Sequence, residues 1–451
     1  MDWLAEFTDV PDKVQHLADR ITDIGLEVEE IVRLDRQISK VDVATVTHTE
    51  THPEQTQLTV CELESDHGDA RIVTAAPGVR EQAKYLWARP GATLPGQTVE
   101  SRDFRGIESE GMLVSSRELG LTQEAQTLLA IPEQYDNGQT AVDVLELEEP
   151  ILELDLTPNR PDCLSHLGVA RDFAAAEGLQ LTDPRPRTLP DGTDTDVKIN
   201  IESPEDCWSY TGVPVAGVNV QPSPFERKKR LLKMGLRPLN NIVDITNYTL
   251  FEVGHPLHPF DYDRIVSPVT IRRAQDGETI HTLDGESREL KAEDLVIADR
   301  HGPQALAGIM GGTNAQVEPR TDRILLEGAY FNPTTIRSTA GRLKIHTEAS
   351  HRFERGCDPV DYTRAIARCL ELMSEDPAQD DEFTIFDPVS VVEHEPETTQ
   401  ISFAPETCKH SIGFHPGKET MKTQLSRLGL TINNQGSQWE LTVPSWRRDL
   451  S

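Results

Sequence analysis

The alternation of hydrophobic and polar positions changes period along this chain, and the changes predict both helices and strands. Apolar residues from Leu17 to Ile24 recur at helical spacing, and Gly25 ends that pattern. An alternating run follows, so residues 1–38 are expected to form a small helix-and-strand cap. Residues 39–150 hold several alternating or apolar runs separated by turn residues, which is typical of a strand-rich domain.

Proline and glycine mark the next boundaries. A stiff Pro-rich turn precedes a helical pattern that ends at Gly178, and Asp162 in that turn is expected to cap the helix. A Pro- and Asp-rich linker follows, so residues 151–200 are interpreted as a connector. Residues 201–390 mix helical and strand patterns, and 391–451 hold a helix and a strand. The chain is therefore predicted to be a multidomain α+β protein.

One stretch, from Gly235 to Asp261, mixes polar side chains into an apolar pattern. Two adjacent amides lie near its start, and Asp244, Thr246 and Asn247 have apolar neighbours. Buried polar groups need hydrogen-bond partners. The stretch is therefore predicted to hold either a satisfied polar network or a polar pocket. It ends in a Pro-rich turn that would fix the direction of an imidazole.

Composition narrows the class of protein. A length of 451 residues predicts roughly three domains at ~150 residues each. The six cysteines include no C-x-x-C pair, which argues against a zinc site or a disulfide framework and fits a reducing cytoplasm. The first residues lack a basic, apolar leader, and no run approaches ~20 apolar residues. We therefore expect a cytoplasmic protein without a signal peptide or a membrane span.

Charge argues against nucleic-acid binding, except at one place. The net charge is −32, from 76 acidic and 44 basic residues, whereas phosphates need cationic partners. Local clusters decide binding, however. Five cations fall within one predicted helix and make it a candidate RNA-binding surface: Arg227, Lys228, Lys229, Arg230 and Lys233. The alternative is an ordinary solvated helix face.

Several strings resemble one protein family. GLRPLNN, VDITNYTLFEVGHPLH, ALAGIMGGTNAQV, ILLEGAYFNPTTIR and TEASHRFERGCDP occur in the same order in the beta subunit of bacterial phenylalanyl-tRNA synthetase, and LTPNRPDCLS resembles it too. The resemblance covers essentially the whole chain. It implies an oligonucleotide-binding-type β-barrel at 39–150, an α+β editing module at 201–390 and a small winged-helix-like domain at 391–451.

In that family, the editing module hydrolyses tyrosine that is wrongly esterified to the phenylalanine tRNA. The resemblance places this proofreading site on eight residues here, each of the type that the family's pattern requires. Four would act in catalysis and four would contact the substrate: His258, Asn247, Thr246 and Glu327, and Ala307, Gly308, Thr347 and Ala349.

These residue types suit that task. A carboxylate such as Glu327 can accept a hydrogen bond from a tyrosine hydroxyl, and phenylalanine would leave it unpaired at a cost of about 1–3 kcal/mol. An alanine and a glycine allow backbone to approach a ring. His258 and Asn247 can position water or the terminal ribose, and whether an imidazole or a ribose hydroxyl assists that water is open. A zinc site at His255 and His258 is disfavoured because no third ligand is evident.

The resemblance also implies cofactors and partners. Asp449, in PSWRRDL, matches one magnesium-binding carboxylate of the family, but magnesium needs several oxygen ligands. ATP would be used by the holoenzyme and not bound here. The partners would be tRNA(Phe) and a catalytic alpha subunit, in an assembly of two alpha and two beta chains. Because no ATP-site motif is evident, we do not expect the chain to aminoacylate tRNA alone. The chain matches about half to three-fifths of a usual family member.

Two alternatives stay open. Where the family usually shows HPNADKL, this chain reads HPEQTQL from His52 to Leu58, which removes a lysine and adds a glutamate. A barrel that binds RNA needs basic groups and aromatic platforms, so a structural or docking role is favoured for this domain. For the whole chain, the alternative function is a tRNA- or synthetase-associated module that binds without hydrolysis. An autonomous esterase would lack a recognisable nucleophile.

Overall fold

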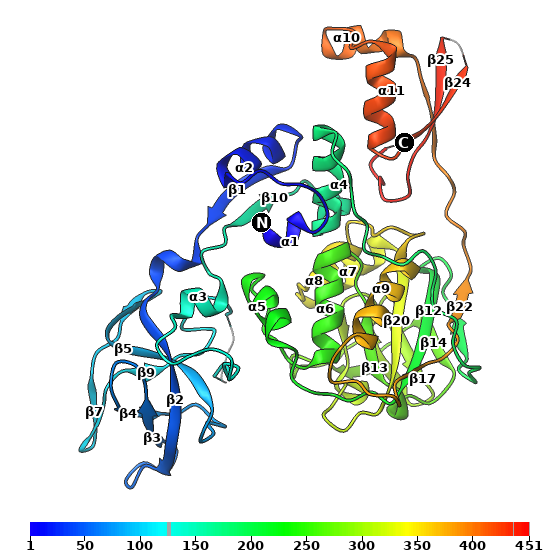
Figure 1. Cartoon of the computed structure of the whole chain (residues 1–451). Helices are drawn as coiled ribbons and strands as arrows, with labels where there is room; N and C mark the ends of the chain where they lie inside the picture. The colour runs from blue at the N-terminus through cyan, green and yellow to red at the C-terminus, as the bar shows by residue number, and fades with distance from the viewer. Residues whose placement is uncertain (124–127, 436, 451) are drawn as a thin grey trace. The chain divides into compact units, whose positions relative to one another are not determined.

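The structure is a computed structural model that describes residues 1–123, 128–435 and 437–450. Contacts within the chain divide it into two compact units. The first consists of Met1, Glu29–Glu153 and Ser223–Leu239, and the second of Asp2–Val28, Leu154–Pro222 and Asn240–Ser451. Both units contain helices and strands, which confirms the predicted α+β class (Figure 1). In the described residues, no helix is long and apolar enough to span a membrane.

An antiparallel sheet forms the body of the first unit. Its strand order is β4–β3–β2–β5–β6, and β9 pairs with β5. Val43 and Leu86 lie in one of its buried clusters, as their alternating pattern predicts. The strands are β2 (Ser39–Thr51), β3 (Thr59–Glu64), β4 (Ala70–Thr74), β5 (Lys84–Leu94), β6 (Gln97–Thr98) and β9 (Met112–Leu113), with a separate hairpin of β7 (Arg102–Phe104) and β8 (Ile107–Ser109).

The closure of the predicted barrel needs correction. Among the described residues no ladder joins β4 to β9, the two strands that would have to meet. One backbone hydrogen bond bridges them, from Glu110 N to Arg71 O at 2.8 Å. β9 is only two residues long, and Gly111 before it lies so close to β5 that a Cβ would be 2.1 Å from Ala88 O. The strand-rich fold was correctly predicted, but in the described residues the sheet does not close into a barrel.

Two helices complete the first unit, with the short 3-10 helix η1 (Leu34–Gln37). They are α3 (Ala141–Leu145) and α5 (Phe225–Lys233), and Leu145 and Leu232 are buried in the same cluster. Gly235 follows α5 with φ +78°, the left-handed conformation that glycine tolerates best. The predicted cationic helix is therefore part of the strand-rich unit. Strands β1 (Glu27–Val32) and β10 (Ile151–Asp155) each cross a boundary between the units.

The second unit begins with short helices, and one predicted cap is wrong. They are α1 (Asp2–Ala5), α2 (Val14–Asp23), η2 (Pro161–Cys163) and α4 (His166–Glu177). α4 ends at Gly178 as predicted, but Ser165 caps its start and accepts a hydrogen bond from Gly168 N at 3.0 Å. Asp162 lies in η2, where Arg160 binds both of its carboxylate oxygens. The Arg160 guanidinium already binds the Asp162 carboxylate, and Ser165 caps the helix instead.

Two five-stranded sheets build the centre of the second unit. The first has the order β11–β14–β17–β18–β19: Ile199–Ile201, Val269–Arg273, Leu295–Asp299, Gly302–Leu306 and Met310–Gly311. The second has the order β13–β20–β12–β21, with β22 also on β12: His258–Asp261, Arg323–Phe331, Cys207–Ala216, Thr384–Ile385 and Val389–Val392. Smaller elements are η3 (Tyr262–Arg264), β15 (Thr279–His281), β16 (Ser287–Glu289) and η4 (Thr313–Ala315).

The second of these sheets is buried on both faces. One face shares a core with the first sheet and with α7 (Pro333–Leu343) and α8 (Glu348–Phe353), and includes Phe260, Leu325 and Phe331. The other face packs on α6 (Asn241–Val253) and α9 (Tyr362–Ser374), through Ile324 and Leu326 (Figure 1). Because side chains alternate along β20, neighbouring residues reach different cores.

The C-terminal part of the second unit is a small α+β fold. It contains β23 (Gln400–Phe403), η5 (Pro405–Thr407), α10 (Cys408–Ile412), α11 (Lys418–Arg427), β24 (Thr431–Gln435) and β25 (Gln438–Thr442).

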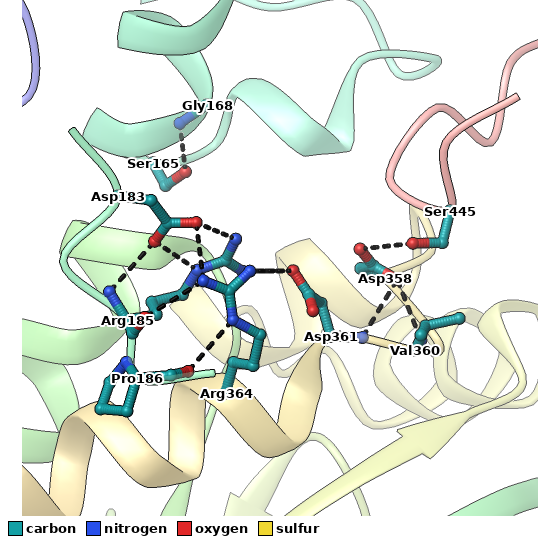
Figure 2. A network of polar contacts seen from close by, with 10 residues as sticks. All are labelled: Ser165, Gly168, Asp183, Arg185, Pro186, Asp358, Val360, Asp361, Arg364 and Ser445. Atoms are coloured by element: carbon teal, nitrogen blue, oxygen red, sulfur yellow. Dashed lines mark hydrogen bonds and ion pairs between the residues drawn. The ribbon is translucent and has the colours of Figure 1, made fainter. Parts of the chain in front are cut away.

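Figure 2 shows the polar network beside α9 that reaches the segment after β25. Arg185 pairs with Asp183 at 2.8 Å and with Asp361 at 2.9 Å, and Ser445 donates to Asp358 at 3.0 Å.

Candidate functional site

Two of the predicted site residues, His258 and Glu327, are direct neighbours across two strands. His258 is the first residue of β13, and the strand register pairs it with Glu327 of β20. Directly opposed residues of antiparallel strands project from the same face, with Cβ atoms about 4.5–5.5 Å apart. Phe260 and Leu325, the next pair on that face, are buried in the core with α7 and α8. The imidazole and the carboxyl group therefore belong to one cluster.

Glu327 is a buried carboxyl group with a tyrosine beside it. Its exposed fraction is 7%, and the hydroxyl of Tyr210 on β12 donates to Oε2 at 2.8 Å. Burial raises the pKa of Glu327 to about 8, although the hydrogen bond from Tyr210 opposes the rise. Near pH 7 the neutral acid therefore predominates, and the group can both donate and accept a hydrogen bond.

His258 is a half-buried imidazole held by contacts with its ring. The Phe260 ring meets it edge to face, with 4.5 Å between centroids. On the other side is Gly311 of β19, where a Cβ would lie 2.6 Å from His258 Cε1. Burial lowers the pKa of His258 to about 4, so the ring is neutral at pH 7. A neutral imidazole offers one nitrogen that donates and one that accepts, as the positioning of water requires.

The loop between β18 and β19 brings the two small predicted residues to this cluster. Ala307 is fully buried, and Gly308 has φ +65°. A Cβ on Gly308 would lie 2.9 Å from Phe331 Cδ2 and 3.0 Å from Phe353 Cδ2. Glycine is therefore required for both the backbone conformation and the space. After this loop the chain reaches Gly311, which lies beside the His258 ring.

Thr347 and Ala349 lie at the start of α8. Thr347 caps the helix, because its Oγ1 accepts from Ser350 N at 3.0 Å. The same hydroxyl donates to Ile309 O at 2.9 Å, in the loop between β18 and β19. Thr347 thus ties α8 to that loop, and Ala349 is half-buried in the first turn of the helix.

Thr246 and Asn247 come from a different layer. They lie on α6, whose Ile242 and Ile245 are buried in the core on the other face of the sheet. The Thr246 hydroxyl donates to Val243 O within its own helix at 2.8 Å. Among the described residues, neither side chain is hydrogen-bonded to His258 or Glu327. Thr246 and Asn247 therefore come to the site from the helix layer that contacts β13, and the other six predicted residues come from the sheets, the loop between β18 and β19 and the start of α8.

The five predicted RNA-binding cations are not equivalent. Lys229 pairs with Glu146 and, at 2.8 Å, with Glu226, and its side chain is only 3% exposed. Lys233 pairs with Glu149 and is 7% exposed. These two lysines therefore stabilise the packing of α5 on its own unit. The other three, Arg227, Lys228 and Arg230, are half-buried and also have interactions within the protein.

The predicted magnesium ligand does not fit a metal site in the described part of the chain. Both oxygens of Asp449 accept from Arg447, Oδ1 from Nε at 2.8 Å and Oδ2 from Nη2 at 2.9 Å. A second group of ligand atoms, at Asp162, Cys163 and Asp172, lies within 4.8 Å of one another. The Arg160 guanidinium binds all three of those residues. An arginine side chain therefore already binds the ligand atoms at both positions, Arg447 at Asp449 and Arg160 at the second group.

Tyr210 was missed in the sequence. It lies in a strand that reads as apolar and β-branched, where a tyrosine is easily taken as a core residue. The signal is that a buried phenol needs a hydrogen-bond partner. Its partner lies far away in the sequence, and only the register of β12 against β20 brings them together.

Comparisons with known proteins match three successive parts of the chain. Three family models match: a putative tRNA binding domain over 41–140, a B3/4 domain over 206–376 and a tRNA synthetase B5 domain over 401–451. All eight predicted site residues fall within the B3/4 match, as does Tyr210.

Curated relatives resemble the chain over its whole length. A phenylalanine–tRNA ligase beta subunit of Geobacter sulfurreducens is 40% identical and covers 100% of this chain, which spans 56% of that protein. One of Carboxydothermus hydrogenoformans is 43% identical over 83% of this chain and 47% of that protein. A solved N-terminal fragment of the Pyrococcus horikoshii phenylalanyl-tRNA synthetase beta subunit is 14% identical, with a TM-score of 0.34 over 67% of this chain and 83% of that one. The chain thus spans about half the length of the curated relatives it matches.

Proposed function

Because the chain belongs to the family of phenylalanine–tRNA ligase beta subunits, we propose that it binds tRNA(Phe) and hydrolyses tyrosine wrongly esterified to it. The observation that carries the proposal is the direct opposition of His258 and Glu327 within the B3/4 match. The His258 imidazole is suited to positioning water, and the Glu327 carboxyl group to accepting a hydrogen bond from a phenol.

The proposed reaction is the hydrolysis of an ester. Water adds to the carbonyl carbon, the bond from that carbon to the ribose oxygen breaks, and the ribose oxygen takes up a proton. The products are free tyrosine and a tRNA with a free terminal hydroxyl. His258 orients the attacking water, and its accepting nitrogen or a ribose hydroxyl receives the water's proton. Neutrality at pH 7 leaves that nitrogen able to accept.

Selection of tyrosine rests on Glu327. A phenol hydroxyl can hydrogen-bond to the free oxygen of the carboxyl group, whereas a phenylalanine ring would bury that oxygen without a partner, at a cost of about 1–3 kcal/mol. The protein already makes this kind of contact, because the phenol of Tyr210 donates to the same group at 2.8 Å. The Ala307–Gly308 backbone supplies a close wall whose only side chain is the methyl group of Ala307.

Attachment of phenylalanine would take place on a separate catalytic alpha subunit, which uses ATP. In this proposal two alpha and two beta chains assemble in the cytoplasm. Magnesium has no proposed role in this chain, because Asp449 is bound by Arg447. The three half-buried cations of α5 are the proposed RNA contacts. The match of residues 41–140 to a putative tRNA binding domain supports RNA contact there too, against the docking role that the HPEQTQL segment predicted.

The test is deacylation by the purified chain. Tyrosyl-tRNA(Phe) is mixed with the native chain or with the His258→Ala variant, and loss of the ester is followed against the spontaneous rate. The proposal predicts that the native chain accelerates hydrolysis and that the variant does not. Binding without acceleration would favour the alternative, a tRNA-binding module without hydrolysis.

A further inference from the structure

We infer that Tyr210 is a positioning residue that turns Glu327 so that one carboxylate oxygen is reserved for the ligand. This inference rests on the proposed function and deepens it, since it names the group that sets the selectivity of the site. Tyr210 does not touch the substrate in this arrangement. It acts only through Glu327.

The geometry of the sheet fixes the contact. β12 and β20 pair with Tyr210 opposite Ala329 and Gly212 opposite Glu327. Tyr210 and Glu327 are therefore diagonal neighbours on one face, within reach of a long aromatic side chain. Gly212, directly opposite Glu327, has no side chain that could donate a hydrogen bond, and a Cβ there would meet only the apolar side chains of Ile199 and Leu325. The Tyr210 hydroxyl holds the carboxyl group, at 2.8 Å from Oε2.

The other oxygen, Oε1, is left without a protein donor. Among the described residues, the hydrogen bond from Tyr210 is the only one that Glu327 makes with its side chain. Oε1 is also not one of the fully enclosed side-chain atoms that lack a partner. Its partner must therefore be solvent or a ligand. A single anchored oxygen and a single open one give the carboxyl group a defined direction.

Tyr210 itself cannot move to follow a ligand. Its ring is fully buried in the core that also contains Phe260 and Phe331. A rigid second residue that locks a site residue is what preorganised binding requires. Without the hydroxyl, Glu327 could turn toward solvent or toward the water held by His258, and a phenol would no longer meet an aligned acceptor.

The experiment removes only the hydroxyl, with Tyr210→Phe, and compares hydrolysis of tyrosyl- and phenylalanyl-tRNA(Phe). The rate ratio of the two esters should fall several-fold. It should not fall further when Tyr210→Phe is added to Glu327→Ala, because residues that act through one another are not additive. Tyr330→Phe is the matched control, since this buried tyrosine lies on β20 itself but projects to the opposite face. It should leave the ratio unchanged.

A second readout does not depend on activity. The ionisation of Glu327 is followed by isotope-edited infrared spectroscopy in the native chain and in Tyr210→Phe. Loss of a donor to the carboxylate should move the titration midpoint to higher pH. An unmoved midpoint overturns the inference, and so does an equal fall of the ratio in the native and Glu327→Ala backgrounds. If the native chain hydrolyses neither ester, the proposed function fails, and the titration alone decides the role of Tyr210.

Discussion

Burial determines the charge that each residue of the cluster carries at neutral pH. The imidazole of His258 and the carboxyl group of Glu327 are both neutral there, because burial lowers the first pKa to about 4 and raises the second to about 8. An ion pair between them would require a raised pKa for His258 and a lowered pKa for Glu327. The cluster therefore acts through hydrogen bonds between neutral groups and not through a fixed charge.

The first prediction concerns His258. In the proposed reaction its ring orients water or the ribose, which both esters share, so His258→Ala should slow hydrolysis of tyrosyl and phenylalanyl esters alike, by ~10²-fold or more. The ratio between the two esters should stay close to the native value. Parallel measurements of both deacylation rates test this, and a selective loss for one ester would contradict the assignment.

The second prediction concerns the protonation of Glu327. Its pKa of about 8 lies above the ordinary value of 4.5, so between these pH values the folded state keeps a proton that the unfolded state has lost. The contribution of Glu327 to the unfolding free energy should therefore fall as pH rises through that window, by about 1.4 kcal/mol per pH unit at most. Urea unfolding of the native chain and of Glu327→Gln at pH 5, 6.5 and 8 measures the difference. Parallel pH profiles would show that the carboxyl group is not buried as described.

At the scale of elements, α5 combines packing with a cationic surface. Lys233→Met removes a buried partner of Glu149 and should destabilise the first unit, by about 1–3 kcal/mol. Glu149 keeps the N-terminal ammonium of Met1 at 2.9 Å, which limits the loss. Lys228→Met, on the same helix, is the matched control and should cost less. Equal losses in thermal unfolding would mean that the Lys233 pair has no special role.

The same helix gives a prediction for RNA. Changing Arg227, Lys228 and Arg230 to glutamine together should weaken tRNA binding and reduce its dependence on salt, because fewer counterions are released. Lys229 and Lys233 are left in place so that folding is preserved. Affinity measured at several salt concentrations tests the effect, and an unchanged slope would assign α5 to packing alone.

Individual elements show what the sequence could and could not predict. The predicted helix ends at Gly25 and Gly178 are confirmed, because the positive φ angle that ends a helix at a glycine is a local property. Asp162 was expected as a cap, but Arg160 beside it competes for the same carboxylate. Lys229 and Lys233 were interpreted only as cations, since their acidic partners come from a distant part of the sequence. The hydrogen bond between Tyr210 and Glu327 could not be predicted for the same reason, since the two residues are far apart in the sequence.

At the scale of the whole molecule, acidity should be more damaging than mild alkalinity. Burial lowers the pKa of His255 and His258 to about 4, so the unfolded state binds protons more readily below about 6.5. The pKa of Glu149 is lowered to about 2 by Lys233 and the N-terminus, which outweigh its burial, and its stabilisation fades as pH falls below 4.5. The two histidines reduce the unfolding free energy between pH 6.5 and 4, Glu149 adds to the fall only below pH 4.5, and the opposite effect of Glu327 offsets about one of the two histidines above that pH. Thermal unfolding across that range should show a steady fall in melting temperature, and a flat profile would contradict it.

The α+β class could be predicted because it depends on local patterns of apolar and polar residues. The contents of the site could be predicted only in part. The match of residue types identified His258 and Glu327, whereas their direct opposition depends on the register of β13 against β20. No spacing in the sequence reveals that register, because four of the five strands of the first sheet lie between the two strands in the sequence.

The most direct test of the account is the ratio of deacylation rates for tyrosyl- and phenylalanyl-tRNA(Phe), measured as kcat/KM for the native chain and for Glu327→Ala. The account predicts that the native chain prefers the tyrosyl ester and that the variant loses this preference, by roughly 1–3 kcal/mol or about 5- to 150-fold. If Glu327→Ala keeps the native ratio, Glu327 does not read the hydroxyl, and the assignment of the site is wrong.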